Sequence, residues 1–361
     1  MDNELNLSLA IAGLVVGVIF GFIVQRSRFC MTAIVSNFVL MRDVRQFYTY
    51  LTAVLLAIIG VFYLELSEMV SIADSAYRSG GIHWLSAISG GLVFGLGSVM
   101  AGGCIGRVLA LTGEGNLGGL LALLAISLSA TVMYTGAFEP IRIWLYQLAV
   151  IQTEDASILH LLNTPLWLFI SFLLPVSLML VYMSYKRRIE IKHILVGGML
   201  GLLVIVGWWI TGNVGVDEFS VRRPASLTFS GPIAKVALSL TVGNEPQGIF
   251  GFTMVIGVVF GSFMSAVSSG HFRITHPSSD SFARIFNGGL LMGVGAMLAG
   301  GCNIGQGLTG VSTLSIESIL VVVAIFIGMY AGVKWLQYKE DHSSIWNGIR
   351  KQFYQLSNQI H

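Results

Sequence analysis

The sequence predicts an all-α integral membrane protein that has about nine transmembrane helices, short re-entrant helices and two pseudo-symmetric, inverted halves. The first observation is composition: of 361 residues, 55% are hydrophobic and 11% are charged, whereas soluble domains carry roughly 25% charged residues. The second is a series of apolar segments long enough to cross a hydrocarbon core of roughly 30 Å. The third is a repeat, because GGLVFGLGSVMAGGC at 90–104 returns without a gap as GGLLMGVGAMLAGGC at 288–302.

Nine apolar segments are predicted to cross the membrane. The 43 glycines fit this class, because small residues let transmembrane helices approach closely and unwind around a site. The expected crossings are 5–24, 46–66, 84–101, 117–137, 165–185, 193–212, 247–266, 286–300 and 316–337.

Three short apolar pieces are predicted to be re-entrant rather than spanning. Two of them, 105–111 and 304–308, follow the Gly-Gly-Cys repeats. Non-helical backbone at membrane depth is tolerated only where it is buried in protein or lines a cavity, so both breaks should point inward. The third piece, 31–41, is about half a span long and follows a polar interruption at 25–30.

The distribution of Lys and Arg predicts the orientation. Basic residues mark the loops near 42–45, 186–192 and 334–339 as cytoplasmic, which places the C-terminus inside and the N-terminus outside. The segment ending at Cys104 then runs inward and the one ending at Cys302 runs outward. That is an inverted repeat, in which the site lies between the halves near the bilayer midplane.

The expected organisation is a single transmembrane domain with four parts. These are a first half at 1–150, connecting helices and an outer loop at 151–246, a second half at 247–340 and a cytoplasmic tail at 341–361. The loop at 213–246 is expected to cover the outer mouth, and the tail to form a surface amphipathic helix or a mobile end. The first residues lack a basic region and a small-residue cleavage site, so no removable signal peptide is expected.

A further match joins Gly17 and Gly21 to Gly257 and Gly261, within GVIFG and GVVFG. Extended with a three-residue insertion, this match pairs 29–32 with 272–275 and puts Arg273 in the place of Cys30. The match sits poorly with an inverted repeat, because the two segments come out with the same direction.

The three cysteines, Cys30, Cys104 and Cys302, all lie within or beside apolar segments, so a secreted disulfide framework is not expected. A lone cysteine in a membrane helix is most often a small apolar filler. Here all three stand at chain breaks and two hold equivalent places in a repeat, which favours a functional role. A neutral thiol offers a weak donor and a polarizable sulfur, a soft resting point for a sulfur-bearing anion.

Several other residue types next to the cysteines are candidates for contacts with an anion. An intramembrane charge usually faces a cavity or a partner, so Arg107 is an anion-site candidate and Glu114 its expected partner; a purely structural ion pair is the alternative. The second half offers amides and a hydroxyl at the matching place, and helix N-termini after each Gly-Gly-Cys would favour anions. The complete set is Cys30, Cys104, Cys302, Arg107, Glu114, Asn303, Gln306, Gly103 and Gly301, with Arg26, Arg28, His271 and Arg273 as flanking candidates.

No cofactor, metal site or nucleic-acid site is expected. The cysteines form no Cys-x-x-Cys pair, and buried thiolates would be costly without a metal. The Gly-rich runs lack the Lys-Ser/Thr of a phosphate loop. A net charge of +2 is too small to indicate a nucleic-acid partner.

The chain carries three motifs: QRSRFCM at 25–31, AGGCIGR at 101–107 and AGGCNIGQGLTG at 299–310. Together they closely resemble the YeeE/YedE membrane family, the bacterial thiosulfate uptake proteins. The resemblance implies a bacterial inner-membrane protein shaped like an hourglass, with thiosulfate passed along three cysteines that match Cys30, Cys104 and Cys302. It also implies a small cytoplasmic sulfur-carrier partner of the TusA type. Relatives linked to selenium and other sulfur compounds leave the substrate less determined than the fold.

Two functions of other classes compete with uptake by a transporter. One is a membrane thiol transferase or oxidoreductase whose cysteine accepts a sulfane sulfur, although no general base lies near the cysteines in the sequence. The other is a passive channel for small anions. We expect a transporter rather than an enzyme, with thiosulfate and the lipid bilayer as its partners.

Overall fold

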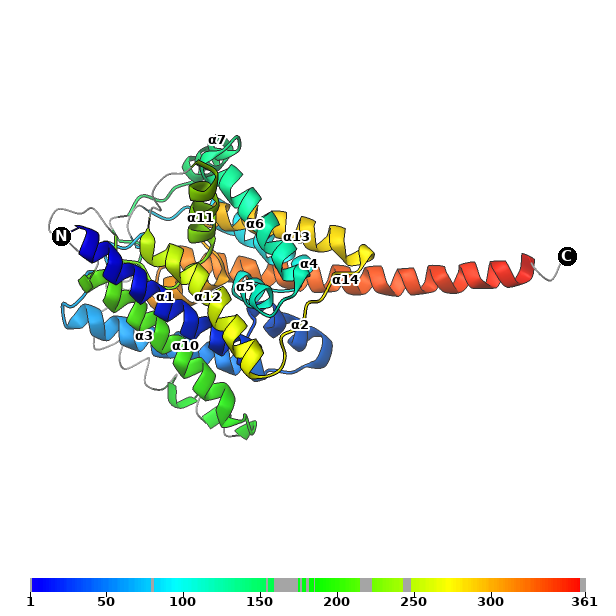
Figure 1. Ribbon diagram of the computed structural model, residues 1–361, viewed down its shortest axis with the longest axis horizontal. Coiled ribbons are helices and arrows are strands. Elements are labelled where there is room, and N and C mark those ends of the chain that lie inside the picture. The colour runs from blue at the N-terminus through cyan, green and yellow to red at the C-terminus, as the bar shows by residue number, and fades with distance from the viewer. Residues whose placement is uncertain are drawn as a thin grey trace.

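The protein is a bundle of long helices in the computed structural model, which describes residues 2–78, 81–153, 155–158, 175, 177–179, 182–184, 186–214, 223–242 and 248–357. The backbone alone is described for 2–5, 214, 241–242, 280 and 340–357. The elements in chain order are α1 (Asp2–Ser27), α2 (Met31–Met41), α3 (Arg45–Leu66), α4 (Trp84–Ala101), α5 (Ile105–Gly113), α6 (Leu117–Thr135), α7 (Glu139–Leu148), α10 (Ile191–Trp209), η1 (Ile210–Val214), α11 (Ser230–Val242), α12 (Ile249–Ser268), α13 (Ser279–Leu298), η2 (Gly305–Gly310) and α14 (Ile316–Ser357) (Figure 1).

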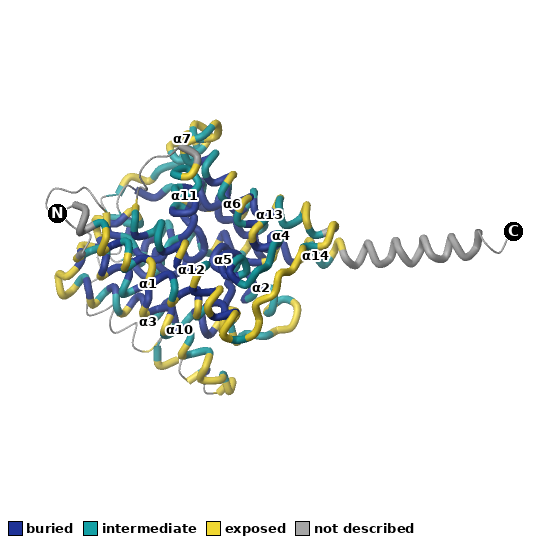
Figure 2. Tube along the Cα trace, in the orientation of Figure 1, coloured by how far each residue is buried: buried dark blue, intermediate teal, exposed yellow. Residues whose placement is uncertain are grey.

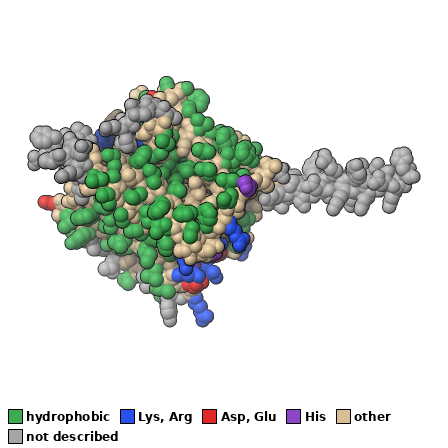
Figure 3. All heavy atoms as spheres, in the orientation of Figure 1, with side chains coloured by type: hydrophobic (Ala, Val, Ile, Leu, Met, Phe, Trp, Pro, Cys, Tyr) green, Lys and Arg blue, Asp and Glu red, His purple; other side chains and the backbone are tan. Residues whose placement is uncertain are grey.

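Eight stretches within the described residues are long and apolar enough to cross a membrane. The predicted all-α membrane class is therefore confirmed. Two stretches, Asn6–Met41 and Trp84–Gly113, each join a long helix to the short helix that follows it. The expected crossing at 165–185 lies largely outside the described residues. Figure 3 shows hydrophobic side chains spread over the middle of the molecule and basic side chains gathered where α12 ends and α10 begins.

The centre of the bundle is the antiparallel pair α4 and α13. Gly90 packs against Ala299, near the end of α13, and Gly288 packs against Ala101, at the end of α4. The absence of side chains at these glycines lets the two backbones touch. Because α14 runs parallel to α4 and α6 parallel to α13, each repeat contributes the same set of helices in opposite directions, as in an inverted repeat.

The helices α1 and α12 are parallel neighbours, not copies related by the inversion. Gly17 packs against Met254, and Gly261 packs against Val18. The sequence match between the two helices therefore reflects shared packing, since both faces of a close parallel pair need glycine. The extension that put Arg273 in the place of Cys30 is wrong, because Cys30 is buried at the centre whereas Arg273 is exposed.

Both Gly-Gly-Cys breaks occur where the repeat predicts them. Helix α4 ends at Ala101 with Gly102 in the left-handed region (φ 85°), and Gly300 after α13 is also left-handed (φ 65°), a conformation that glycine adopts without strain. The piece after Cys104 is the short helix α5, whereas the piece after Cys302 includes a π-helical turn, η2. Such turns are rare and are frequently found at functional sites.

Two segments between the predicted crossings contain further helices. The loop at 213–246 includes α11, and α7 follows α6. Helix α11 escaped prediction because it is short and has Gly231 and Pro232 in its first turn. It packs on α6, where the Thr131 hydroxyl donates to the Ala234 carbonyl at 3.3 Å. Figure 2 shows the buried residues concentrated inside the bundle between these outer helices and α3.

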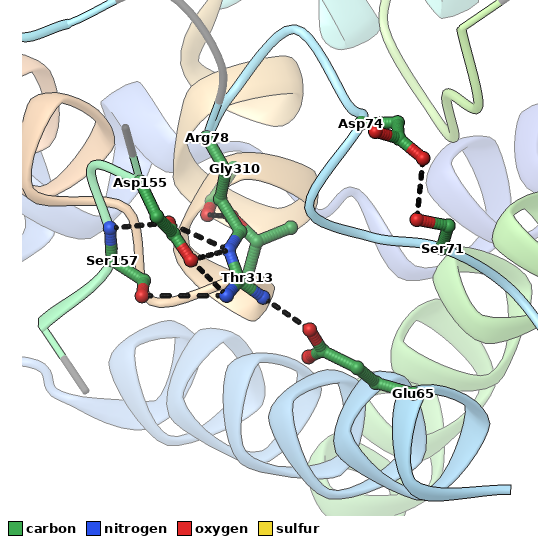
Figure 4. Close-up of polar contacts among 8 residues, drawn as sticks. All are labelled: Glu65, Ser71, Asp74, Arg78, Asp155, Ser157, Gly310 and Thr313. Atoms are coloured by element: carbon green, nitrogen blue, oxygen red, sulfur yellow. Dashed lines mark hydrogen bonds and ion pairs between the residues drawn. The ribbon is translucent and has the colours of Figure 1, made fainter. Parts of the chain in front are cut away.

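The loop between α3 and α4 is fixed by one arginine. The Arg78 guanidinium pairs with the carboxylates of Glu65 and Asp155, and also reaches the Ser157 hydroxyl at 3.4 Å (Figure 4). Only 11% of the Arg78 side chain is exposed. This cluster ties three distant segments together beside the turn that leads from η2 into α14.

Helix α14 continues as one element to Ser357. The sequence predicts a crossing at 316–337 followed by a separate surface tail. The helix continues instead, because no glycine or proline interrupts the chain from 333 to 347. The end of this helix projects beyond the rest of the bundle (Figure 1).

Candidate functional site

The three cysteines are buried and have free thiols. The Sγ atoms of Cys30 and Cys104 lie 3.7 Å apart, and the Cys104 backbone N–H donates to the Cys30 sulfur at 3.5 Å. Cys302 lies just before η2, where the Gly305 N–H donates to its sulfur at 3.4 Å. Residues that are distant in the sequence thus form one close thiol pair, with the third thiol at the start of the second short helix.

Each thiol of the close pair is positioned by a helix start. Cys30 is the N-cap of α2, and it follows Arg28, whose backbone is left-handed (φ 54°). Cys104 is the N-cap of α5 and follows the Gly102-Gly103 break. A Cβ atom at Gly103 would lie 3.8 Å from the Cys30 sulfur and 3.1 Å from Arg107 Cγ, so glycine leaves room there for both side chains.

A cavity of about 350 Å³ opens beside the Cys30–Cys104 pair. Its lining includes Cys30, Thr32, Arg28 and Arg107 together with apolar residues of α14. Arg107 Nη1 donates to Glu114 Oε1 at 2.8 Å, so the predicted partnership of these two residues is observed. The arginine therefore faces the cavity with its charge partly balanced. Because the basic loops near 28 and 42 border this side, we call it the inner cavity.

A second and larger cavity, of about 870 Å³, opens on the opposite side, and we call it the outer cavity. Among the described residues that line it, cationic groups outnumber anionic ones, because Arg142, Arg223 and Lys235 accompany one carboxylate, Glu317. Such a lining raises the local concentration of small anions. The polar residues that line it also include Gln306 and Tyr77.

Two tyrosines of the outer cavity keep their protons. Burial raises the pKa of Tyr77 and Tyr146 above the usual range, so both hydroxyls remain neutral donors. Tyr77 stacks edge-on against Trp208, and the ring of Tyr146 lies 4.4 Å from that of His83.

No described residue lines both cavities, and the short pieces after Cys104 and Cys302 meet between them. A Cβ atom at Gly106 would lie 3.7 Å from Ile304 Cγ1 and 3.5 Å from the Phe20 ring. Ile304 and Phe20 are both almost completely buried. We call this region the neck.

The two amides of the second repeat differ in their partners. The Gln306 amide is satisfied, since its nitrogen donates to the Ala299 carbonyl at 3.0 Å and its oxygen accepts from Ser318 at 2.6 Å. Asn303 lies next to the Cys104 sulfur. It has no exposed surface, and neither of its amide atoms makes a hydrogen bond of normal geometry to a described residue.

Three flanking candidates lie away from the cavities. Arg26 is exposed and donates to the Ser269 hydroxyl. His271 and Arg273 are exposed in the loop between α12 and α13, where the Arg273 backbone N–H donates to the Glu114 carbonyl at 3.2 Å. Arg28 alone among the flanking candidates lines a cavity.

Sequence reasoning missed an acidic site beside the second break. Glu317 accepts hydrogen bonds from the His83 backbone N–H at 3.0 Å and pairs with His83 Nδ1 at 3.1 Å, and Gly300 lies against Tyr146 and Glu317. The only signal was the position of Glu317 at the predicted start of a helix. His83, Tyr146, Arg142 and Lys235 come from other segments, so no spacing rule could join them.

The described residues contain no group of three or more His, Cys, Asp or Glu side chains that could hold a metal ion. The arrangement that they do form consists of two cavities, an apolar neck and thiols on both repeats. A multi-pass α-helical membrane protein with opposed cavities belongs to the structural class of membrane transport proteins.

A family model described as Sulphur transport matches residues 26–331, and the chain belongs to this family. It is 29% identical over 351 residues to the thiosulfate transporter TsuA of Escherichia coli K12, an alignment that covers 92% of this chain and 95% of the relative. It is 27% identical over 342 residues to TsuA of Spirochaeta thermophila, covering 91% and 98%. The predicted resemblance is confirmed, and these relatives are named as transporters rather than enzymes.

Proposed function

We propose that this protein imports thiosulfate across the bacterial inner membrane. The observation that carries the proposal is the set of three buried thiols, each at the start of a short helical piece, together with the neck that two of these pieces form between the opposed cavities. The family and the relatives named as thiosulfate transporters support the same substrate.

In this proposal the anion enters the outer cavity, attracted by Arg142, Arg223 and Lys235. It then passes Cys302, Cys104 and Cys30 in turn and leaves through the inner cavity beside Arg107 and Arg28. Thiols suit the passage because they are weak donors with polarizable sulfur, and conduction needs sites that bind an ion well enough to admit it and weakly enough to release it. No bond to the thiosulfate sulfur forms or breaks.

The other site residues have supporting roles. Gly103 and Gly301 leave space beside the thiols, Gln306 fixes the turn around Gly301, and Glu114 balances Arg107. Arg26 and Arg273, which lie outside both cavities, add positive charge to the inner surface, and His271 lies in the same loop as Arg273.

The proposal includes the surroundings of the path. The halves at 1–150 and 247–340 would supply its two walls, with the N-terminus outside and the C-terminus in the cytoplasm. A small cytoplasmic sulfur-carrier protein of the TusA type would receive the sulfur compound on the inner side. The concentration of basic residues on the loops of that side supports this orientation.

Replacement of single cysteines tests the proposed path. We expect Cys104→Ala and Cys302→Ala each to abolish thiosulfate-dependent growth while the protein still reaches the membrane, because each removes one contact for the anion in an apolar neck. Growth on thiosulfate in a strain that lacks its own importers measures this, with membrane immunoblots as the control. Cys→Ser variants show whether sulfur itself is needed. Normal growth of both alanine variants would contradict the path.

A further inference from the structure

Two buried polar side chains beside the thiols have no other hydrogen-bonding partner in the part of the chain that the structure describes. Asn303 lies beside Cys104 and Thr32 beside Cys30. Asn303 is 0% exposed and Thr32 is 5% exposed. Apart from these neighbouring thiols, neither the Asn303 amide nor the Thr32 hydroxyl has a hydrogen-bonding partner among the described residues.

Unsatisfied polar groups of this kind are exceptional in native proteins. Buried hydroxyls and amides nearly always make hydrogen bonds, because losing the interactions with water destabilises the folded state. Ser36, one turn after Thr32, satisfies its own hydroxyl by donating to the Thr32 carbonyl at 3.1 Å. The Thr32 hydroxyl makes no such local bond with a described residue, and Thr32 is one of the residues that line the inner cavity.

The two repeats differ at this point. The residue after Cys302 is Asn303, whereas the residue after Cys104 is Ile105, which is also completely buried. An apolar side chain therefore fits the environment next to a neck cysteine, and the packing of the neck does not by itself require an amide.

We propose that Asn303 and Thr32 are specificity-determining residues, each of which pairs a hydrogen-bond donor with a thiol so that thiosulfate is held at both of its ends. This inference rests on the proposed function. Thiosulfate has a soft terminal sulfur and a sulfonate group with hard oxygens. Each of two successive positions offers one neutral donor and one polarizable sulfur. The first consists of the Asn303 amide and Cys104, and the second of the Thr32 hydroxyl and Cys30. Neutral donors stabilise the sulfonate oxygens without the strong attraction of a full positive charge.

Isosteric replacements separate this role from a structural one. Asn303→Leu keeps the branching at Cγ, and Thr32→Val keeps the branching at Cβ, while each removes the donor. We expect each variant to lower the initial rate of labelled thiosulfate uptake in proteoliposomes by at least about fivefold. The melting temperature in detergent should stay equal to that of the wild type or rise, because a buried unsatisfied group is replaced by an apolar one. Thr32→Ser, which retains the hydroxyl, should transport like the wild type.

Matched controls use the same replacements outside the path. Asn213 is exposed and its amide donates to the Trp209 carbonyl at 3.2 Å, and the Thr52 hydroxyl donates to the Tyr48 carbonyl at 2.8 Å. Neither residue is among the described residues that line the inner or the outer cavity. Asn213→Leu and Thr52→Val should therefore transport at the wild-type rate.

Three results overturn the inference while leaving the proposed function intact. One is uptake reduced by less than fivefold in either Asn303→Leu or Thr32→Val. Another is a melting temperature of Asn303→Leu more than about 5 °C below the wild type, which would mean that protein groups satisfy the amide. The third is Thr32→Ser transporting as poorly as Thr32→Val. If the wild type itself takes up no thiosulfate, it is the proposed function that fails.

Discussion

Arg107 connects the short helix α5 to the inner cavity through a single side chain. Its guanidinium bonds to Glu114, and its stem lies beside Gly103. About 16% of the arginine side chain and 19% of the glutamate side chain are exposed, and Arg107 is one of the residues that line the inner cavity. At this position the glutamate limits how strongly the arginine can hold a passing anion.

Removing the guanidinium tests this balance. With Arg107→Gln, the Glu114 carboxylate would face the cavity unpaired and repel the anion, so we expect the rate of thiosulfate uptake to fall about tenfold. The double variant Arg107→Gln with Glu114→Gln should recover part of that loss, because the repulsion disappears. Uptake by reconstituted protein measures both. A double variant as slow as Arg107→Gln would mean that repulsion by Glu114 is not the cause.

At the scale of elements, glycine stripes hold the helices close together. A Cβ atom at Gly261 would overlap the Val18 carbonyl oxygen of α1, whereas a Cβ atom at Gly198, on α10, would meet no atom within 4 Å. Both glycines lie within long helices, but only Gly198 has room for a larger side chain.

Alanine substitutions exploit this contrast. Gly261→Ala should push α1 away from α12 and destabilise the protein by about 1–3 kcal/mol. Gly198→Ala should be neutral or stabilising by up to about 1 kcal/mol, since alanine favours the helix. Thermal unfolding in detergent compares the two variants. Equal melting temperatures for both would show that the close contact of α1 with α12 adds nothing to stability.

The sequence pattern predicts a helix or a break only where local features, such as segment length or a glycine, determine it. The short helix α2 at Met31–Met41 and the breaks at Gly102 and Gly300 follow from segment length and glycine conformation. The helix α11 depends on packing against α6, a tertiary contact that leaves no local pattern. The sequence match between α1 and α12 led to a wrong pairing of the two halves. Two parallel neighbours share a pattern of small residues because they pack against each other, and not because the inversion relates them.

The whole molecule joins elements that sequence alone could not bring together. The three cysteines and the Arg107–Glu114 pair were recognisable from their motifs. The outer cavity was not, because Tyr77, Arg142, Lys235 and Glu317 come from four separate segments. The closeness of Cys30 to Cys104, at 3.7 Å, also depends on how the fold brings the starts of α2 and α5 together.

On the scale of the molecule, we expect a path that is selective for one substrate. It would consist of two opposed cavities with cationic linings and the neck between them, with the three thiols along it. The outer cavity attracts any small anion, so selectivity has to arise at the neck, where the soft sulfur atoms lie. Sulfate and selenite lack a terminal sulfur and gain less from these contacts. We therefore expect the protein to distinguish thiosulfate from sulfate and selenite as the anions pass the thiols, and not as they enter the outer cavity.

The most direct test of the central claim is uptake of labelled thiosulfate by purified protein in vesicles, with labelled sulfate and selenite compared in parallel. Runs with and without an imposed proton gradient or membrane potential identify the driving force. Protein-dependent accumulation of thiosulfate, at a rate well above those of sulfate and selenite, is the predicted result. Equal rates for all three anions, or no thiosulfate uptake under any gradient, would contradict the assignment.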